Sequence, residues 1–294
     1  MKKLLALLLA MVMLLCLPAC VSDDEDEDSK TGSAKKNSSN KRPVTFQETL
    51  VVDNEVCTIK VTDVDPDNSM GFTISVYLEN KTDKKLQFEL IYSTTNGVTN
   101  DPLWMSNVDA GKKANEEIYY YSIADKDLTT LIGDYTDIAL TFQASDAEDY
   151  WADPLTQASV HIYPYGEDKA TTFVRQSQSS DQVLIDNEHL TVIVTDYQKD
   201  DFYSLMVNLY IVNKTDSTIW IESNDTSVNG FMCDPYFMEI IYPNTGCFTE
   251  FYWTSDTLKD NKIDKIEEIE MTLVAQDHYN YTIKFAEETV TLHP

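Results

Sequence analysis

The chain has 294 residues, of which 50 are acidic and 22 are basic, so its net charge is −28. A surface this acidic repels nucleic acids and anionic lipid headgroups, which excludes both as partners. With only 8 glycines, the composition also argues against nucleotide-binding α/β folds, whose phosphate-binding loops require glycine.

The first twenty residues have the pattern of a bacterial export signal. Lys2 and Lys3 precede an uncharged apolar run over residues 4–17, which is shorter than the roughly 20 residues that cross a bilayer. The run ends in the motif LPAC at Cys20, which resembles the lipobox of bacterial lipoproteins. The resemblance implies a signal peptide over residues 1–19, a lipid on the Cys20 thiol, and a protein anchored to the extracellular face of the cell membrane.

Residues 20–43 are predicted to form a lipidated, disordered tether. An acidic run over residues 23–28 is followed by a basic stretch that ends at Arg42. Polar, charged segments of low complexity cannot bury enough apolar surface to fold. The acidic run could lift the folded part off the membrane, but a plain linker without a specific partner is the simpler interpretation.

Two similar segments follow the tether. The motifs DNE, NKTD, NG and DP recur at an offset of 133 residues, and residues 53–102 share 18 identities in 50 positions with residues 186–235. A unit of about 115 residues has the size of a domain rather than of a solenoid repeat. We therefore predict two repeats, residues 44–164 and 183–294, joined by a Ser/Gln-rich linker over residues 165–182.

Polar and apolar residues alternate within each copy. The alternation is clearest over residues 58–62 and 72–78 in the first copy and over residues 190–194 and 205–211 in the second. This period of two predicts half-buried β-strands, and the Asn-Gly pairs predict turns. One short helical piece is expected over residues 125–132. The fold class that we predict is all-β, with two tandem antiparallel β-sandwiches of immunoglobulin-like type.

The lipobox, the acidic tether and the NKTD–NG–DP pattern resemble surface lipoproteins of clostridia-like Gram-positive bacteria. The two repeats are similar to the immunoglobulin-like domains grouped with the mycobacterial immunoprotective extracellular antigen. The resemblance covers both repeats and implies their fold and an extracellular address. It implies no catalytic residues, because that group has no established chemistry.

Three cysteines lie beyond the signal and Cys20, namely Cys57, Cys233 and Cys247. An odd number does not make a disulfide framework. Cys233 and Cys247 could form one disulfide outside the cell. Free thiols at both positions are an equally good expectation.

Patterns for catalysis or metal binding are missing from the sequence. Residues 63–74 begin like a calcium loop but have Asn68 and Ile74 where such a loop needs Gly and Glu. The four histidines form no HExxH motif, and neither a nucleophile elbow nor a P-loop is present. We therefore expect no enzymatic activity, no metal site and no cofactor.

Each copy contains an aromatic triplet, over residues 119–121 in the first and 251–253 in the second. Successive residues of a strand face opposite sides, so at least one ring of each triplet is expected in the core. Within the triplets, Tyr120 and Trp253 are the candidate ligand-facing aromatics. Packing within the sheets explains both triplets more simply.

These observations favour a membrane-anchored, non-catalytic binding module whose partner is an unknown extracellular protein or glycan. Loops or an exposed sheet edge would carry its site. One alternative is a glycan-binding protein, which exposed aromatics clustered on one sheet face would indicate. Another is a cation-binding surface module, which converging carboxylates would indicate.

Overall fold

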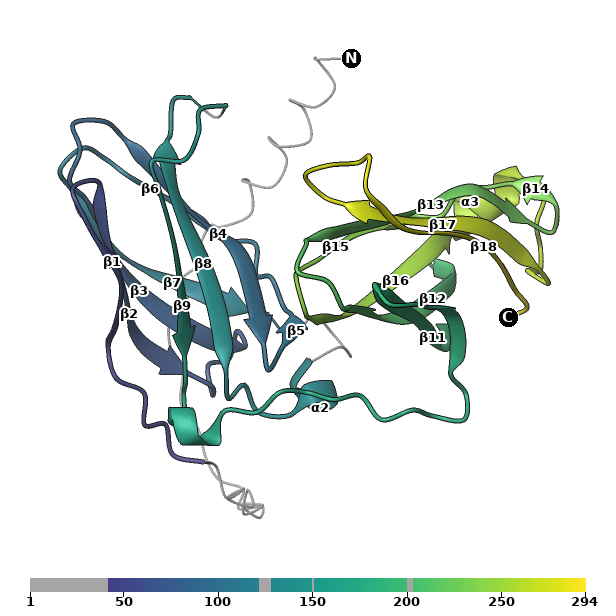
Figure 1. Cartoon of the computed structure of the whole chain (residues 1–294), viewed down its shortest axis with the longest axis horizontal. Coiled ribbons are helices and arrows are strands. Elements are labelled where there is room, and N and C mark those ends of the chain that lie inside the picture. Colours follow the sequence, from purple (N-terminus) through teal and green to yellow (C-terminus); the bar gives the residue numbers. More distant parts are fainter. Residues whose placement is uncertain (1–41, 122–127, 150, 200–202) are drawn as a thin grey trace, which may run out of the picture. The chain divides into compact units, whose positions relative to one another are not determined.

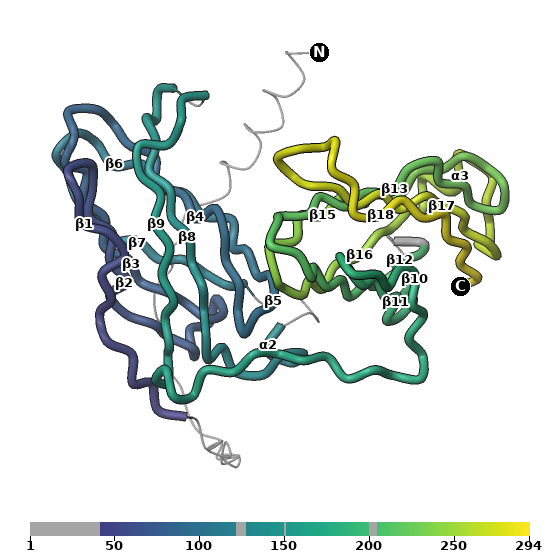
Figure 2. Tube along the Cα trace, in the orientation of Figure 1, coloured from purple at the N-terminus to yellow at the C-terminus, as the bar shows by residue number. Residues whose placement is uncertain are grey.

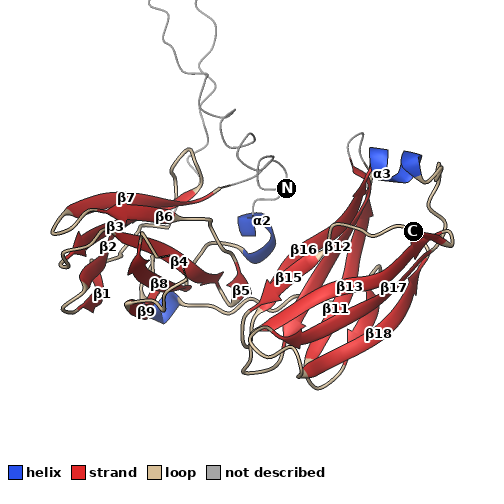
Figure 3. Cartoon of the chain, turned by 90° about the horizontal axis from the view of Figure 1, so that it is seen from above, coloured by secondary structure: helices blue, strands red, loops and turns tan. Residues whose placement is uncertain are grey.

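Figure 1 shows the computed structural model of the chain, which describes residues 42–121, 128–149, 151–199 and 203–294. Strands, red in Figure 3, make up most of these residues, and residues 42–294 form one compact unit. Cys20 and most of the tether lie outside the described residues. Within the described ranges, no helix is long and apolar enough to cross a membrane.

The alternating segments of the first repeat form strands β1 to β9. Within them, residues 59–62 and 74–80 alternate between buried and partly exposed side chains, as the sequence pattern predicts. The strand bounds are β1 Thr49–Asp53, β2 Cys57–Asp65, β3 Phe72–Asn80, β4 Leu86–Thr95, β5 Val98–Thr99, β6 Met105–Val108, β7 Lys113–Tyr120, β8 Ile138–Asp146 and β9 Thr156–Ile162.

These strands form two antiparallel layers. One sheet has the order β1-β2-β3-β7, and the second pairs β4 with β8, β8 with β9, and β5 and β6 with β4. The chain crosses between layers from β3 to β4, and β7 returns to pair with β3. This is the connectivity of the A-B-E and C-F-G sheets of immunoglobulin-like sandwiches, so the predicted fold class is confirmed.

The second repeat has the same connectivity, in strands β10 to β18. Figure 2 shows its trace in green to yellow and that of the first repeat in purple to teal. Its sheets are β10-β11-β12-β16 and β14-β13-β17-β18, with β15 also paired to β13. The strand bounds are β10 Gln182–Asp186, β11 Leu190–Gln198, β12 Tyr203–Asn213, β13 Ile219–Val228, β14 Phe231–Met232, β15 Met238–Ile241, β16 Gly246–Thr254, β17 Ile269–Asp277 and β18 Lys284–Leu292.

The two repeats agree in detail as well as in order. Thr49 pairs with Val61 as Gln182 pairs with Val194, and both pairings contain a bulge at the same place. Each sandwich encloses its own apolar core, in which a fully buried Ile or Leu side chain contributes about 1.5–3 kcal/mol. The repeat motifs therefore mark two copies of one fold.

Turns and short helices connect the strands. Asn96 and Gly97 have φ angles of 51° and 78°, and Asn229 and Gly230 have 51° and 80°, which is the left-handed pair required by a tight hairpin of type I′. Helix α2 covers Leu128–Ile132, the described part of the predicted helical piece, and α3 covers Ser255–Asp260. A 3₁₀ turn, η1, spans Glu167–Lys169.

The sheets of the two repeats meet at β5 and β16, within the compact unit. Val98 pairs with Gly246 in parallel, and the Gly246 N–H donates to the Gly97 carbonyl at 3.0 Å. The Tyr242 hydroxyl, just before β16, donates to the Asp101 carboxylate at 2.6 Å. Backbone and side-chain bonds thus join the repeats at this point.

Candidate functional site

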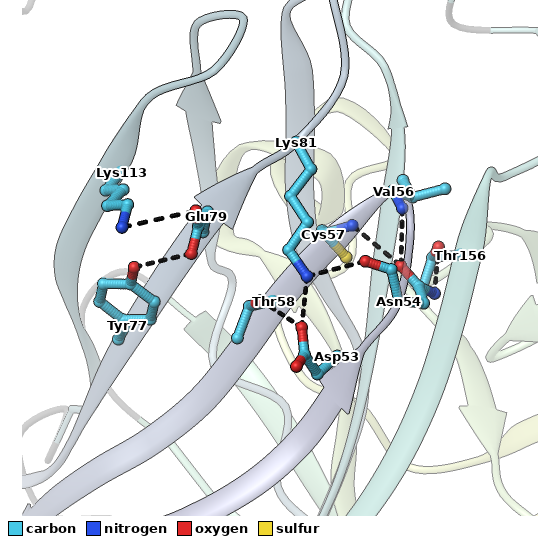
Figure 4. A network of polar contacts seen from close by, with 10 residues as sticks. All are labelled: Asp53, Asn54, Val56, Cys57, Thr58, Tyr77, Glu79, Lys81, Lys113 and Thr156. Atoms are coloured by element: carbon cyan, nitrogen blue, oxygen red, sulfur yellow. Dashed lines mark hydrogen bonds and ion pairs between the residues drawn. The ribbon is translucent and has the colours of Figure 1, made fainter.

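The shared DNE and NKTD motifs form a polar clasp at one rim of each sandwich. In the first repeat, the Lys81 ammonium forms an ion pair with Asp53 and donates to the Asn54 carbonyl at 2.8 Å (Figure 4). The Asn54 side chain accepts the N–H groups of Val56 and Cys57, both at 2.9 Å. The hydrogen bond from Lys81 holds the pKa of the Asp53 carboxyl below its usual range.

The same clasp recurs in the second repeat. Lys214 donates to the Asp186 carboxylate at 2.8 Å and to the Asn187 carbonyl at 2.7 Å. Asn187 in turn accepts the N–H groups of His189 and Leu190, at 2.8 and 2.9 Å. Because the polar groups of both clasps bond to their own loops, the recurring motifs explain the fold rather than a binding activity.

A second surface distinguishes the repeats, and we call it the tyrosine face. It is the outward side of the β1-β2-β3-β7 sheet, on which Tyr77, Asn115 and Tyr119 lie. Tyr77 pairs directly with Asn115 across β3 and β7, and Tyr119 lies four residues farther along β7. Since alternate residues of a strand share one side, both tyrosines face away from the core.

Charged side chains surround the ring of Tyr77. The ammonium groups of Lys60 and Lys113 lie 6.0 and 5.9 Å from the ring centroid, within the range of a cation–π interaction. The Tyr77 hydroxyl donates to Glu79 at 3.0 Å, and Lys113 lies 3.4 Å from the same carboxylate (Figure 4). Tyr77, Lys60 and Glu79 border a shallow depression of about 460 Å³.

Each lysine in or beside the depression has a carboxylate partner. Lys60 bonds to Glu48 at 2.9 Å, and this bond holds the pKa of the Lys60 ammonium above its usual range. Lys113 pairs with Glu79, and Lys81 pairs with Asp53. The depression therefore has both donors and acceptors, and with Lys113 beside it the nearby lysines equal the carboxylates in number.

Tyr119 continues the face toward the end of β7. Its hydroxyl donates to Glu117, and its ring lies 5.6 Å from that of Tyr121 at an interplanar angle of 33°. Tyr121 is 56% exposed. Two half-exposed aromatic areas, one at Tyr77 and one at Tyr119 and Tyr121, thus lie on one side of the sheet.

Tyr120 and Trp253, the candidate ligand-facing aromatics of the two triplets, do not face outward. Tyr120 is 5% exposed and Trp253 is fully buried. The Tyr120 hydroxyl bonds to Ser93 at 2.7 Å, and the Trp253 indole donates to the Cys233 carbonyl at 2.8 Å. Burial also raises the pKa of Tyr120. Both rings lie in the core, and their neighbours along the strand face outward.

The equivalent face of the second repeat is covered by the chain itself. Tyr210, which corresponds to Tyr77, is only 7% exposed. Rings of Phe248 and Phe173 lie 4.6 and 6.3 Å from it, and the Arg175 guanidinium lies 5.8 Å above it. Phe173 and Arg175 belong to the linker segment, so this part of the linker occupies a surface that stays open in the first repeat.

Cys233 and Cys247 are free and buried, which is the second of the two expectations left open for them. Burial raises the pKa of the Cys247 thiol well above its usual range and that of Cys233 more modestly. Cys57 is also free and buried. Thiols in apolar surroundings are poor nucleophiles, which leaves these groups as core side chains.

A larger cavity of about 610 Å³ lies where β5 meets β16. Its lining includes the carboxyl groups of Asp101 and Glu239. Asp101 accepts the Tyr242 hydroxyl, and Glu239 accepts the Ile240 N–H at 3.1 Å. Because Asp101 bonds across the join between the repeats, we assign the cavity to that join.

The part of the chain that the structure describes contains no group of three or more His, Cys, Asp or Glu placed to hold a metal ion. In the stretch that begins like a calcium loop, Asp65 and Asn68 instead accept the backbone N–H groups of Asp67 and Met70, both at 2.9 Å. These side chains stabilise the turn between β2 and β3.

Comparisons with known proteins assign the chain to no family. No protein-family model matches the chain, and no curated protein matches it. Among solved structures, the YadV chaperone is 15% identical, with 80% of this chain and 99% of that one covered and a TM-score of 0.24. The Salmonella enterica SafA pilin–SafB chaperone complex is 9% identical, with 82% and 98% covered and a TM-score of 0.25.

A β-D-mannosidase from Dictyoglomus thermophilum is 12% identical, with 76% of this chain but 22% of that chain covered and a TM-score of 0.23. Likeness this low identifies neither a ligand nor an activity. The functional argument therefore rests on the surfaces of this chain alone.

Proposed function

We propose that the chain is an exported, lipid-anchored, non-catalytic binding protein whose recognition surface is the tyrosine face of the first repeat. One observation carries the proposal. Tyr77 and Tyr210 are equivalent residues, yet Tyr210 is covered by Phe173 and Phe248 whereas Tyr77 borders an open depression. Aromatic side chains together with a few fixed polar groups commonly line ligand-binding sites.

The polar clasp supports this role by holding the sheet edge in place. Lys81 ties the loop after β3 to the turn between β1 and β2, next to the depression that Asp53 and Lys81 help to line. Binding surfaces supported by fixed elements lose less entropy when a ligand binds. A non-catalytic role agrees with buried thiols and with the absence of catalytic motifs from the sequence.

The membrane anchor is a separate part of the proposal. The motif LPAC at Cys20 supports it, as does the resemblance to surface lipoproteins of Gram-positive bacteria. The test is metabolic labelling with a fatty-acid analogue in a bacterial host that processes lipoproteins. Cys20→Ala is expected to abolish labelling and release the protein from the membrane, whereas Cys16→Ala, the matched control within the signal, is expected to leave both unchanged.

The binding role is tested with the compact unit of residues 42–294, immobilised and exposed to extracts of cell envelope and medium. We expect saturable retention that Tyr77→Ala reduces. Tyr279→Ala is the control, because Tyr279 is 83% exposed but lies outside the tyrosine face. If both variants retain the same material as the wild type, the tyrosine face is not the recognition surface.

A further inference from the structure

We infer that the tyrosine face binds an uncharged, linear carbohydrate, which stacks on the rings of Tyr77 and Tyr119 and bonds to the polar side chains around them. The inference rests on the proposed function and names its ligand class. It follows from the spacing of the rings, the pairing of charges near Tyr77, and the contrast with the second repeat.

The ring spacing suits an extended ligand. Tyr77 lies opposite Asn115, and Tyr119 is four residues farther along β7. Because an antiparallel strand rises about 3.4 Å per residue, the two positions are about 14 Å apart along the strand. One sugar ring is too short to reach both, so the ligand is an oligomer with successive flat, apolar faces that fit aromatic rings.

Polar groups occupy the space between the two rings. Ser75 pairs with Glu117 across β3 and β7, between the pairs Tyr77–Asn115 and Thr73–Tyr119. Ser75 is half-buried, while Asn115 and Glu117 are exposed. Hydroxyl, amide and carboxylate groups offer the donors and acceptors that sugar hydroxyls require, and such groups fix the orientation of a ligand in a binding site.

The pairing of charges near Tyr77 favours an uncharged ligand. Near Tyr77, the lysines Lys60, Lys81 and Lys113 are each within ion-pair distance of a carboxylate, from Glu48, Asp53 and Glu79 respectively. An anionic polymer would have to compete with these carboxylates, and a cationic one with the lysines. Sugar hydroxyls can bond to both partners of such a pair without separating them.

The second repeat shows which residues allow a segment of protein to pack on the equivalent face. There Phe248 and Gly246 stand where the first repeat has Asn115 and Lys113, and Phe173 of the linker covers the ring of Tyr210. A side chain at position 246 would clash with Tyr210. The first repeat has an amide and an ammonium group in place of this apolar surface, so its occupant is a polar molecule rather than an apolar peptide segment.

The test uses residues 42–294 and an array of neutral glucose and N-acetylglucosamine oligosaccharides, with uronic-acid oligosaccharides of equal length for comparison. We expect binding that increases from monosaccharide to longer chains and prefers neutral over anionic probes. Tyr77→Ala and Tyr119→Ala are each expected to weaken it about tenfold. Tyr77→Phe keeps the ring and is expected to retain most of the affinity, and Tyr279→Ala is the matched control.

The outcomes separate this inference from the proposed function. Binding of no carbohydrate, or of anionic probes only, overturns the carbohydrate inference. If Tyr77→Ala then still abolishes retention of another partner, the tyrosine face remains the recognition surface. If carbohydrate binds but neither tyrosine variant weakens it, both the assigned face and the inference are wrong. Circular dichroism of each variant shows whether a loss of binding reflects a loss of fold.

Discussion

Asn213 donates a hydrogen bond from its side-chain amide to the backbone carbonyl of Ile241, at 3.0 Å. The equivalent amide of Asn80, 133 residues earlier, donates to the Val108 carbonyl at 2.9 Å. Both asparagines are only 1% exposed. Each ties the loop that leaves the first sheet to the strand that precedes β7 or β16, which explains why the NKTD motif recurs.

Replacing Asn213 with alanine should therefore destabilise the second sandwich. The change removes donors to the carbonyls of Ser217, Ile241 and Tyr242, and unsatisfied buried polar groups cost about 1–3 kcal/mol. Urea denaturation of residues 42–294 measures the loss. The control Asn224→Ala changes an exposed asparagine of β13 and should stay within about 0.5 kcal/mol of wild type; equal effects of the two variants would contradict this role for Asn213.

Much of this architecture can be predicted from the sequence, because its signals are local. A period of two identifies half-buried strands such as β2 and β3, and Asn-Gly identifies a hairpin whose two central residues have positive φ. The offset of 133 residues identifies two copies of one fold, since the bulges and pairings repeat as well.

The direction of individual rings is harder to predict. Successive rings of the triplet at residues 119–121 point to opposite sides of the sheet in any strand. Which side faces the core depends on the partner strand, where Tyr120 pairs with Phe72 and Tyr119 with Thr73. One signal was present: Tyr77 recurs as Tyr210 and Tyr119 as Tyr252. Whether such a recurring tyrosine is open or covered depends on the fold of the linker, which has no periodic pattern.

The free thiols give a direct chemical test of the core. We expect no alkylation of Cys57, Cys233 or Cys247 by iodoacetamide in the folded unit of residues 42–294, because all three are buried and burial raises the thiol pKa values. In denaturant without reductant all three should react, as mass spectrometry can count. Modification of Cys57 alone would instead indicate a disulfide between the other two.

The linker contact with the second repeat should depend on Arg175. Its guanidinium donates two hydrogen bonds to Asp181, at 2.7 and 2.6 Å, while lying over Tyr210. Arg175→Met should release the segment and speed its cleavage by subtilisin at neutral pH. Lys169→Met, which removes an exposed lysine of η1 paired with Asp168, is the control and should cleave at the wild-type rate.

The ion pair between Arg175 and Asp181 should be lost at low pH. The hydrogen bond from Arg175 lowers the pKa of Asp181 from 3.8 to about 2. A carboxyl group with a lowered folded-state pKa stabilises the fold above its unfolded value and loses that contribution as the pH falls through the folded value. Cleavage of the linker by pepsin should therefore accelerate between about pH 4 and pH 2. If the linker of Asp181→Asn is cleaved at the wild-type rate across this window, protonation of Asp181 does not control the cleavage.

Glu239 should show the opposite dependence on pH. It is half-buried beside the join of the repeats, and burial raises the pKa of its carboxyl group, with Asp101 and Glu250 raising it further. A raised folded-state pKa stabilises the protein below the unfolded value near 4.5, and this contribution is lost as the pH rises. Glu239→Gln removes the charge and keeps the shape. The melting temperature of Glu239→Gln should therefore rise relative to that of the wild type between about pH 4.5 and pH 7. Glu270→Gln, which changes an exposed residue, should show no such trend. A difference for Glu239→Gln that stays constant with pH would mean that the Glu239 carboxylate is fully solvated.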